Sequence, residues 1–334
     1  MDKINIIKKL GSGGNSKAFL GKEISTGRLV TVKMCKTEGE DISGCCNEKN
    51  EIERVNLENE ANILASLDHE CIPKLIKRNR ESIILDYVPG ISLEKVLLTK
   101  GVFAEKEAVR IALEIAGILR YLHGRREAII YRDLKPANVV LRPDGHISLI
   151  DFGAARRYEF GQKSDTLNLG TLGFAAPEQF GNLGQTDPRT DIYCFGMTLL
   201  QLISGVDTKD TDAVAGFKKK GIRGVSSELL GIIDKCTRPD MDDRFMSVKE
   251  IETALLTYPG KVRLRKIGNG IKVVAAAAGL SIVISGCIMQ GESIKNYAVN
   301  DIEVRMPAVR ERLGFIRGWI EEQFEALLGC EVLK

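Results

Sequence analysis

The sequence predicts an α+β fold in which a small β-rich part is followed by a larger, mostly helical part. Short apolar runs with β character occur over residues 1–88, where glycine-rich or polar stretches separate them. A strong amphipathic helix over Glu105–His123 opens the helical part. A third feature is the stretch 273–289, which contains no charged side chain. We therefore expect an α+β core joined to a separate C-terminal segment.

The composition favours a soluble globular core and excludes some classes of protein. Hydrophobic residues make up 44% and charged residues 28% of the chain, and both values are ordinary. The net charge of +3 is too small to indicate a nucleic-acid partner. Eight cysteines include no C-x-x-C pair, which argues against a zinc site or a disulfide framework and for reduced thiols in a cytoplasm. The N-terminus has no apolar run and does not resemble a signal peptide.

The first structural unit reads as strand, glycine-rich loop, strand. Ile4–Leu10 has β character, the loop follows over 11–16, and apolar residues resume at Ala18. Glycines let backbone N–H groups approach phosphate oxygens closely. A simple hairpin turn explains this loop equally well when it is considered alone.

A lysine-bearing strand and a helix follow. Residues 29–33 form a strand that ends in Lys33, for which a solvated surface lysine is the alternative. A polar loop is expected over 38–51 and a helix over 52–67, with Val55, Asn59, Ile63, Leu64 and Leu67 at helical spacing. Residues 82–88 read as a strand that ends at a Pro-Gly turn.

Two loops after apolar strands carry the polar residues with the strongest chemical signal. Asp133, Lys135 and Asn138 lie within six residues between apolar runs, and Asp151 follows the apolar run 148–150. Unpaired charges beside a core are costly, so these residues need a chemical reason. Two such loops can bring an acid, a base and metal-binding oxygens to one place.

The stretches Tyr131-Arg132-Asp133-Leu134-Lys135-Pro136-Ala137-Asn138 and Asp151-Phe152-Gly153 resemble the catalytic loop and the metal-binding loop of protein kinases. The chain is similar to serine/threonine protein kinases of the bacterial, eukaryotic-like type, and the similarity extends from Ile4 to about Tyr258. It implies a bilobal kinase fold. The β-rich N-lobe and hinge would occupy 1–88, and the helical C-lobe would occupy 89–258.

The resemblance also implies the roles of the polar residues. Asp133 would accept or orient the proton of the acceptor hydroxyl, and Lys135 would contact the γ-phosphate of ATP. Asn138 and Asp151 would bind Mg²⁺ or Mn²⁺. Lys33 would bind the α- and β-phosphates and pair with Glu60, in preference to Glu51, Glu53 or Glu58. The other residues expected around ATP are Leu10, Gly11, Ser12, Gly13, Gly14, Ala18, Thr31, Leu85, Asp86, Val88 and Val140; Leu85 is the expected gatekeeper, and Asp86 and Val88 would act through their backbones.

The activation segment would span 151–178. Autophosphorylation of Ser164 or Thr166 is a hypothesis, with Arg132 as the partner of the added phosphate. Thr171 would bridge Asp133 and Lys135 and favour a serine or threonine acceptor. His123, at the end of its helix, is expected to pack or to cap the helix. Three other residues of the C-lobe are expected to be structural. The three structural residues are Asp191, Glu178 and Arg244, of which the last two would pair.

Three positions depart from the family pattern: Ser16 replaces a glycine, Thr31 an alanine and Tyr131 a histidine. A tyrosine can fill the same space against Phe152, so we expect activity. The departures are nevertheless the basis of an alternative function, a catalytically weak scaffold that binds nucleotide and partners. A small-molecule phosphotransferase is disfavoured by Lys135 and by the Ala-Pro-Glu motif over 176–178.

The C-terminal segment predicts a membrane anchor. A basic linker over 259–270 precedes a transmembrane helix over 271–290 and a short tail over 291–334. At about 1.5 Å per residue, the uncharged 17 residues span roughly 26 Å, close to a bilayer core of about 30 Å. The basic run places the kinase in the cytoplasm of a single-pass cell-membrane protein. The alternative is a cytoplasmic protein in which this helix is buried. The expected partners are proteins with Ser/Thr acceptors and the membrane, and a homodimer is left open.

Overall fold

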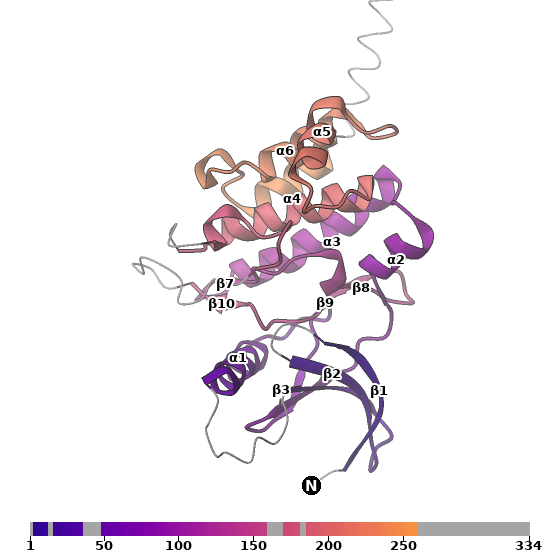
Figure 1. The fold of residues 1–334 in the computed structure, drawn as a ribbon, viewed down its shortest axis with the longest axis vertical. Helices are drawn as coiled ribbons and strands as arrows, with labels where there is room; N and C mark the ends of the chain where they lie inside the picture. Colours follow the sequence, from indigo (N-terminus) through magenta and orange to yellow (C-terminus); the bar gives the residue numbers. More distant parts are fainter. Residues whose placement is uncertain (1–2, 13–15, 36–47, 159–169, 181–184, 259–334) are drawn as a thin grey trace, which may run out of the picture. The chain divides into compact units, whose positions relative to one another are not determined.

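The computed structural model describes residues 3–12, 16–35, 48–158, 170–180 and 185–258, which belong to one unit, Met1–Val262 (Figure 1). Several predicted features lie outside the described residues. They are Gly13, Gly14, Ser164, Thr166, the linker 259–270, the transmembrane helix 271–290 and the tail 291–334. Across the ranges that are described, no helix combines the length and the apolar character needed to cross a membrane.

Five antiparallel strands form the predicted N-lobe sheet in the order β1-β2-β3-β5-β4. Their bounds are Ile4–Ser12, Ser16–Glu23, Leu29–Cys35, Leu75–Arg78 and Ser82–Asp86 for β1 to β5. Residues paired across antiparallel strands share a face of the sheet. The pairs Ala18↔Lys33 and Thr31↔Leu85 therefore place four of the predicted ATP-binding residues on one face.

The helix α1, Glu48–Ala65, begins four residues before the predicted start at Ile52. The predicted apolar face is wrong in part, because Val55 is 56% exposed. The buried face instead contains polar side chains, Glu60 among them, together with Leu57 and Leu64. These positions recur at helical spacing around the carboxylate of Glu60. Apolar periodicity alone could not locate this face, because the residue that orients the helix is charged.

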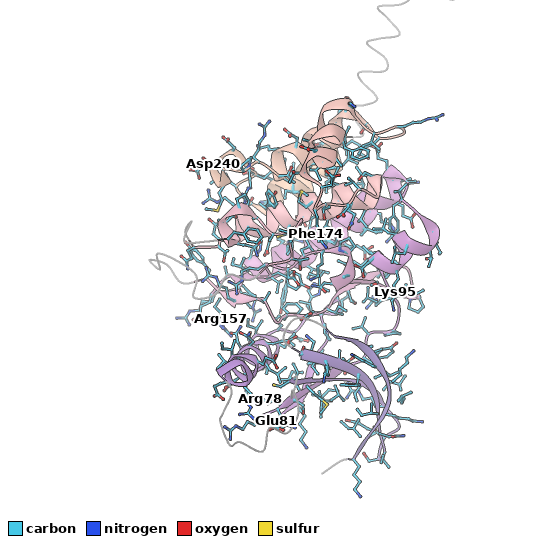
Figure 2. All side chains as sticks on the ribbon, in the orientation of Figure 1. Arg78, Glu81, Lys95, Arg157, Phe174 and Asp240 are labelled. Atoms are coloured by element: carbon cyan, nitrogen blue, oxygen red, sulfur yellow. The ribbon has the colours of Figure 1, made fainter. Side chains whose placement is uncertain are left out.

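The helical lobe contains five labelled helices followed by helical residues 248–258. They are α2 (Leu93–Lys100), α3 (Glu105–His123), α4 (Pro188–Ser204), α5 (Thr211–Lys220) and α6 (Ser227–Cys236). The bounds predicted for α3 are confirmed. The helix α4 begins three residues before the predicted Asp191, because Asp187 caps it and Pro188 occupies its first position. Figure 2 shows Phe174, 9% exposed, within this lobe, whereas Arg78 and Glu81 lie in the sheet lobe.

Short strands carry the two polar loops between the sheet and the helices (Figure 1). The strands β6 (Ile91–Ser92), β8 (Val139–Leu141) and β9 (Ile147–Leu149) form one small sheet, and β7 (Ile129–Ile130) pairs with β10 (Arg156–Arg157). The stretch 131–138 follows β7, and Asp151 follows β9. The two strands from which the polar loops leave, β7 and β9, are buried, so they hold these loops at fixed positions.

Candidate active site

Lys33 joins three elements of the fold. Its Nζ lies 2.5 Å from Oε1 of Glu60 on α1 and 2.8 Å from Oδ1 of Asp151 after β9. Glu60 Oε1 also accepts a hydrogen bond from the backbone N–H of Phe152 at 3.1 Å. Lys33 and Glu60 are 6% and 2% exposed. The structure therefore brings together the predicted Lys33–Glu60 pair and the predicted metal ligand Asp151.

The electrostatics of this triad keep the lysine charged. Burial on its own disfavours the ammonium, but the carboxylates of Glu60 and Asp151 outweigh it and raise the pKa of Lys33. Burial raises the pKa of Glu60, against the opposing effect of the Lys33 ammonium. The same ammonium lowers the pKa of Asp151, against the effect of partial burial. Asp151 is therefore an ionised carboxylate at neutral pH.

Asp133 is the centre of a second network. Its Oδ2 accepts from Lys135 Nζ at 2.8 Å and from Asn138 Nδ2 at 2.9 Å. Its Oδ1 accepts from the Thr171 hydroxyl at 2.6 Å, and this hydroxyl accepts from Lys135 Nζ at 2.6 Å. Three predicted site residues thus fix the carboxylate of a fourth, Asp133, and Thr171 occupies the bridging position predicted for it.

The backbone on either side of the site is in an uncommon conformation. Arg132 and Asp151 have φ angles of 65° and 66°, a region that residues other than glycine seldom adopt. The buried carboxylate of Asp191 accepts hydrogen bonds from the N–H groups of Tyr131 and Arg132 at 2.8 and 2.7 Å. His123 Nε2 lies 2.8 Å from Asp191 Oδ2. The expectation that His123 only packs or caps is therefore incomplete, because it contacts the residue that holds the catalytic loop.

The donor set around Asn138 and Asp151 fits a hard divalent cation. Asn138 Nδ2 donates to the backbone and side chain of Asp133, so its side-chain oxygen takes part in neither bond. Asp151 Oδ1 accepts from Lys33 and, at 3.3 Å, from the Gly153 N–H. No cluster of three or more His, Cys, Asp or Glu residues suited to a metal occurs in the described part of the chain. An amide oxygen, a carboxylate and phosphate oxygens are nevertheless ligands that Mg²⁺ prefers.

Some of the predicted ATP-binding residues share one face of the sheet, and others lie in separate parts of the chain. Ala18, Thr31, Lys33 and Leu85 share the sheet face described above. Five others come from three separate strands or connections. They are Leu10, 38% exposed, with Gly11 and Ser12 at the end of β1, Val140, 7% exposed, on β8, and Val88 after β5.

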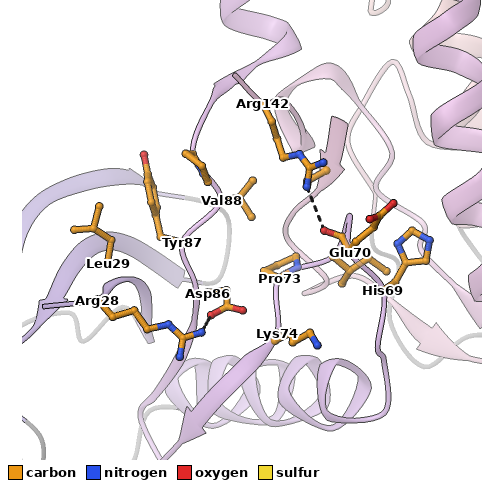
Figure 3. A pocket seen from close by; sticks show the side chains of 13 residues that line it. Arg28, Leu29, His69, Glu70, Pro73, Lys74, Asp86, Tyr87, Val88 and Arg142 are labelled. Carbon is orange, nitrogen blue, oxygen red and sulfur yellow. Dashed lines mark hydrogen bonds and ion pairs between the residues drawn. The ribbon is translucent and has the colours of Figure 1, made fainter. Parts of the chain in front are cut away.

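One backbone group of Asp86 forms a hydrogen bond within the fold. Its N–H donates to the carbonyl of Lys74 at 2.9 Å, so only its backbone carbonyl remains as the predicted adenine partner. Its side chain pairs with Arg28 and lines a cleft of about 290 Å³ behind the hinge, together with Tyr87 and Val88 (Figure 3). The alternation of side chains along β5 explains this, because Leu85 occupies the opposite face.

The predicted structural pair in the C-lobe forms. Arg244, 2% exposed, donates from both terminal nitrogens to Glu178 at 2.7 and 2.9 Å. It also donates to three backbone carbonyls, those of Arg238, Pro239 and Arg189. The pair therefore ties the end of the activation segment to the loop that follows α6.

Two contacts of the site were not expected from the sequence. The hydroxyl of Tyr131 donates to the carbonyl of Ile150 at 2.5 Å, while its ring packs edge-on against Phe152 with centroids 5.1 Å apart. The packing was predicted, and the hydrogen bond was not. Gln179, 3% exposed, donates from Nε2 to the carbonyl of Arg132 at 2.9 Å. Its position directly after the Ala-Pro-Glu motif was the only available signal.

Comparisons with known proteins agree with this geometry. The family model described as protein kinase domain matches residues 4–255. The chain is 26% identical over 273 residues to the probable serine/threonine-protein kinase PknB of Lactococcus lactis, which covers 77% of the chain and 42% of that protein. It is 26% identical over 268 residues to the serine/threonine-protein kinase PrkC of Bacillus subtilis, with 75% and 40% covered. It is 34% identical over 237 residues to the lectin-domain containing receptor kinase VI.4 of Arabidopsis thaliana, with 67% and 32% covered. The chain spans less than half the length of each of these three relatives.

Proposed function

The chain belongs to the protein kinase family, and we propose that it transfers the γ-phosphoryl group of ATP to serine or threonine hydroxyls of proteins. The observation that supports this most strongly is the carboxylate of Asp133, which Lys135, Asn138 and Thr171 hold within hydrogen-bond distance. These contacts are partly buried and hold the carboxylate in one orientation, and phosphoryl transfer needs this kind of fixed acid–base group.

Each residue of the site would have its own role in the transfer. Asp133 would orient the acceptor hydroxyl and accept its proton, since Lys135, Asn138 and Thr171 hold its carboxylate in a fixed position. Lys135 would contact the γ-phosphate, and Lys33, held by Glu60, would bind the other phosphates. Thr171 bridges Asp133 and Lys135 and would face a serine or threonine acceptor.

Asn138 and Asp151 would hold Mg²⁺, or Mn²⁺ in its place, which neutralises charge on the phosphates when it is bound. ATP would lie against the sheet face of Ala18, Thr31 and Leu85, with Val140 on the other side and the backbone of Asp86 and Val88 at the adenine. The glycine-rich loop over 11–16 would cover the phosphates.

Three further proposals concern regions outside the described residues. The segment 271–290 would anchor the chain in the cell membrane with the kinase in the cytoplasm, which its uncharged sequence and the preceding basic run support. One relative is named a receptor kinase, which agrees with an anchor. Ser164 or Thr166 would be autophosphorylated, and the chain would form a homodimer through the anchor. No observation favours the scaffold alternative.

Transfer of labelled phosphate tests the proposed function. The full chain in detergent is incubated with γ-labelled ATP and a generic protein acceptor, with Mg²⁺, with Mn²⁺ and with a chelator. We expect label on serine and threonine but not on tyrosine, and its loss with the chelator and in Asp151→Asn. Asp144→Asn, an exposed carboxylate of a turn, is the matched control and should remain active. Label that survives in Asp151→Asn, or that appears only on small molecules, would contradict the proposal.

A further inference from the structure

Gln179 connects two backbone segments through a single buried amide. Its Nε2 donates to the carbonyl of Arg132 at 2.9 Å, and its Oε1 accepts from the N–H of Ala176 at 2.9 Å. The thiol of Cys194 on α4 donates to the same Oε1 at 3.5 Å. The residue is 3% exposed, so these bonds form away from bulk water. A buried polar group that lacks its hydrogen bond destabilises the folded state.

The carbonyl that Gln179 holds belongs to the strained residue next to Asp133. Arg132 has a φ of 65°, and its N–H is held separately by Asp191. A residue in this region keeps its conformation only when its surroundings fix it. Asp191 fixes one side of Arg132, and Gln179 fixes the other.

The segment 170–180 therefore contacts the catalytic loop at two points. Thr171 bonds to the side chain of Asp133, and Gln179 bonds to the backbone just before it. The two points are packed together, because a Cβ atom at Gly170 would come within 2.9 Å of Gln179 Nε2. Movement of this segment is thus coupled to the direction of the Asp133 carboxylate.

We propose that Gln179 is a positioning residue for phosphoryl transfer. It fixes the position of the catalytic loop relative to the segment 170–180, which would receive the acceptor. This inference rests on the proposed function. Gln179 would act on Asp133 through the carbonyl of Arg132, not through a contact of its own with the nucleotide or the acceptor. Its loss should slow the transfer and weaken use of the protein acceptor, while the affinity for ATP, which depends on Lys33 and the sheet face, stays the same.

Gln179→Glu separates this role from a general packing role. The substitution keeps the size and the acceptor for the Ala176 N–H, but it places a carboxylate oxygen against the Arg132 carbonyl. Burial raises the pKa of such a carboxyl, and its protonated form regains a donor for that carbonyl. We expect about a tenfold lower kcat/KM for the protein acceptor than wild type at about pH 8. At about pH 6, the kcat/KM of Gln179→Glu relative to that of wild type should be at least about threefold higher than at about pH 8.

Two variants complete the experiment. Gln179→Leu has no donor at any pH and should show the loss without the recovery; if it fails to fold in a thermal melt, Gln179→Glu carries the test alone. Gln201→Glu on α4 is the matched control, because Gln201 Nε2 also donates to a backbone carbonyl, that of Val206, away from the catalytic loop. Its rate relative to wild type should be independent of pH.

The outcomes separate the inference from the proposed function. An inactive wild type would remove the proposed function, whatever the variants do. An active wild type with Gln179→Glu within twofold of Gln201→Glu at both pH values would overturn the positioning role. A loss in Gln179→Glu that does not recover on acidification, or that is accompanied by a matching rise in the KM for ATP, would overturn it as well.

Discussion

Replacement of Arg244 by methionine should destabilise the described unit strongly, because it leaves a buried carboxylate without its cation. Arg244→Met removes two hydrogen bonds to Glu178, which is 6% exposed, and three to backbone carbonyls. The remaining described donor to Glu178 is the hydroxyl of Thr190 at 2.8 Å. A neutral hydroxyl compensates a buried charge far less than a bidentate guanidinium does.

The size of the destabilisation follows from the removal of only one partner of the buried ion pair. Breaking a buried ion pair by removing one partner costs about 3–5 kcal/mol of the free energy of unfolding. For a unit of this size, each kcal/mol lowers the melting temperature by about 2–4 °C. Arg244→Met should therefore lower the melting temperature by roughly 6–20 °C, which is large enough to measure even if unfolding is not fully reversible.

The assay is thermal melting followed by far-ultraviolet circular dichroism, since the only tryptophan, Trp319, lies outside the described residues. The double variant Glu178→Gln with Arg244→Met removes the uncompensated charge. It should be less destabilised than the sum of the two single variants by at least about 1 kcal/mol. A fall of less than about 3 °C for Arg244→Met, or strictly additive single and double variants, would refute this reasoning.

Three further predictions concern the site itself. Tyr131→Phe keeps the packing but leaves a partly buried carbonyl without its donor, so it should cost about 1–3 kcal/mol in the free energy of unfolding, measured by urea titration; an unchanged midpoint would count against the hydrogen bond. Thr171→Val should lower kcat about tenfold to a hundredfold through loss of the bond to Asp133, and Thr171→Ser should retain most of the rate; equal rates in both variants would contradict the bridge. The Lys33 ammonium lowers the pKa of Asp151, so the stability that Asp151 contributes is complete above the ordinary carboxyl pKa and is lost as the pH falls through the lower folded value. Below about pH 4 the wild-type melting temperature should therefore fall more steeply than that of Asp151→Asn, and parallel curves would speak against this linkage.

Local motifs made the chemistry of the site predictable, because Asp133, Lys135, Asn138 and Asp151 lie in two short loops that each follow an apolar strand. The choice of Glu60 over Glu51, Glu53 and Glu58 of the same helix also agrees with the contacts seen. The apolar face of that helix was misplaced at Val55, because its orientation depends on a charged contact with a strand about 27 residues earlier in the chain.

The contacts that the sequence did not reveal connect distant parts of the chain. Gln179 reaches Arg132 across 47 positions, and His123 reaches Asp191 across 68. Neither contact leaves a periodic or local pattern, since it depends on how the helices pack. The start of α4 was predicted too late for a different reason. Asp187 and Pro188 are ordinary helix-start signals, but the prediction relied on the apolar run after Asp191.

The role of Asp133 is tested most directly by measuring the rate of a single turnover and the affinity for ATP side by side in the full chain. Asp133→Asn keeps the shape of the side chain but cannot accept the proton of the acceptor hydroxyl. We predict that it binds ATP within twofold of wild type and transfers phosphate at least about a hundredfold more slowly, while Asp144→Asn behaves like wild type. Transfer by Asp133→Asn at the wild-type rate would contradict the catalytic role on which the proposed function rests.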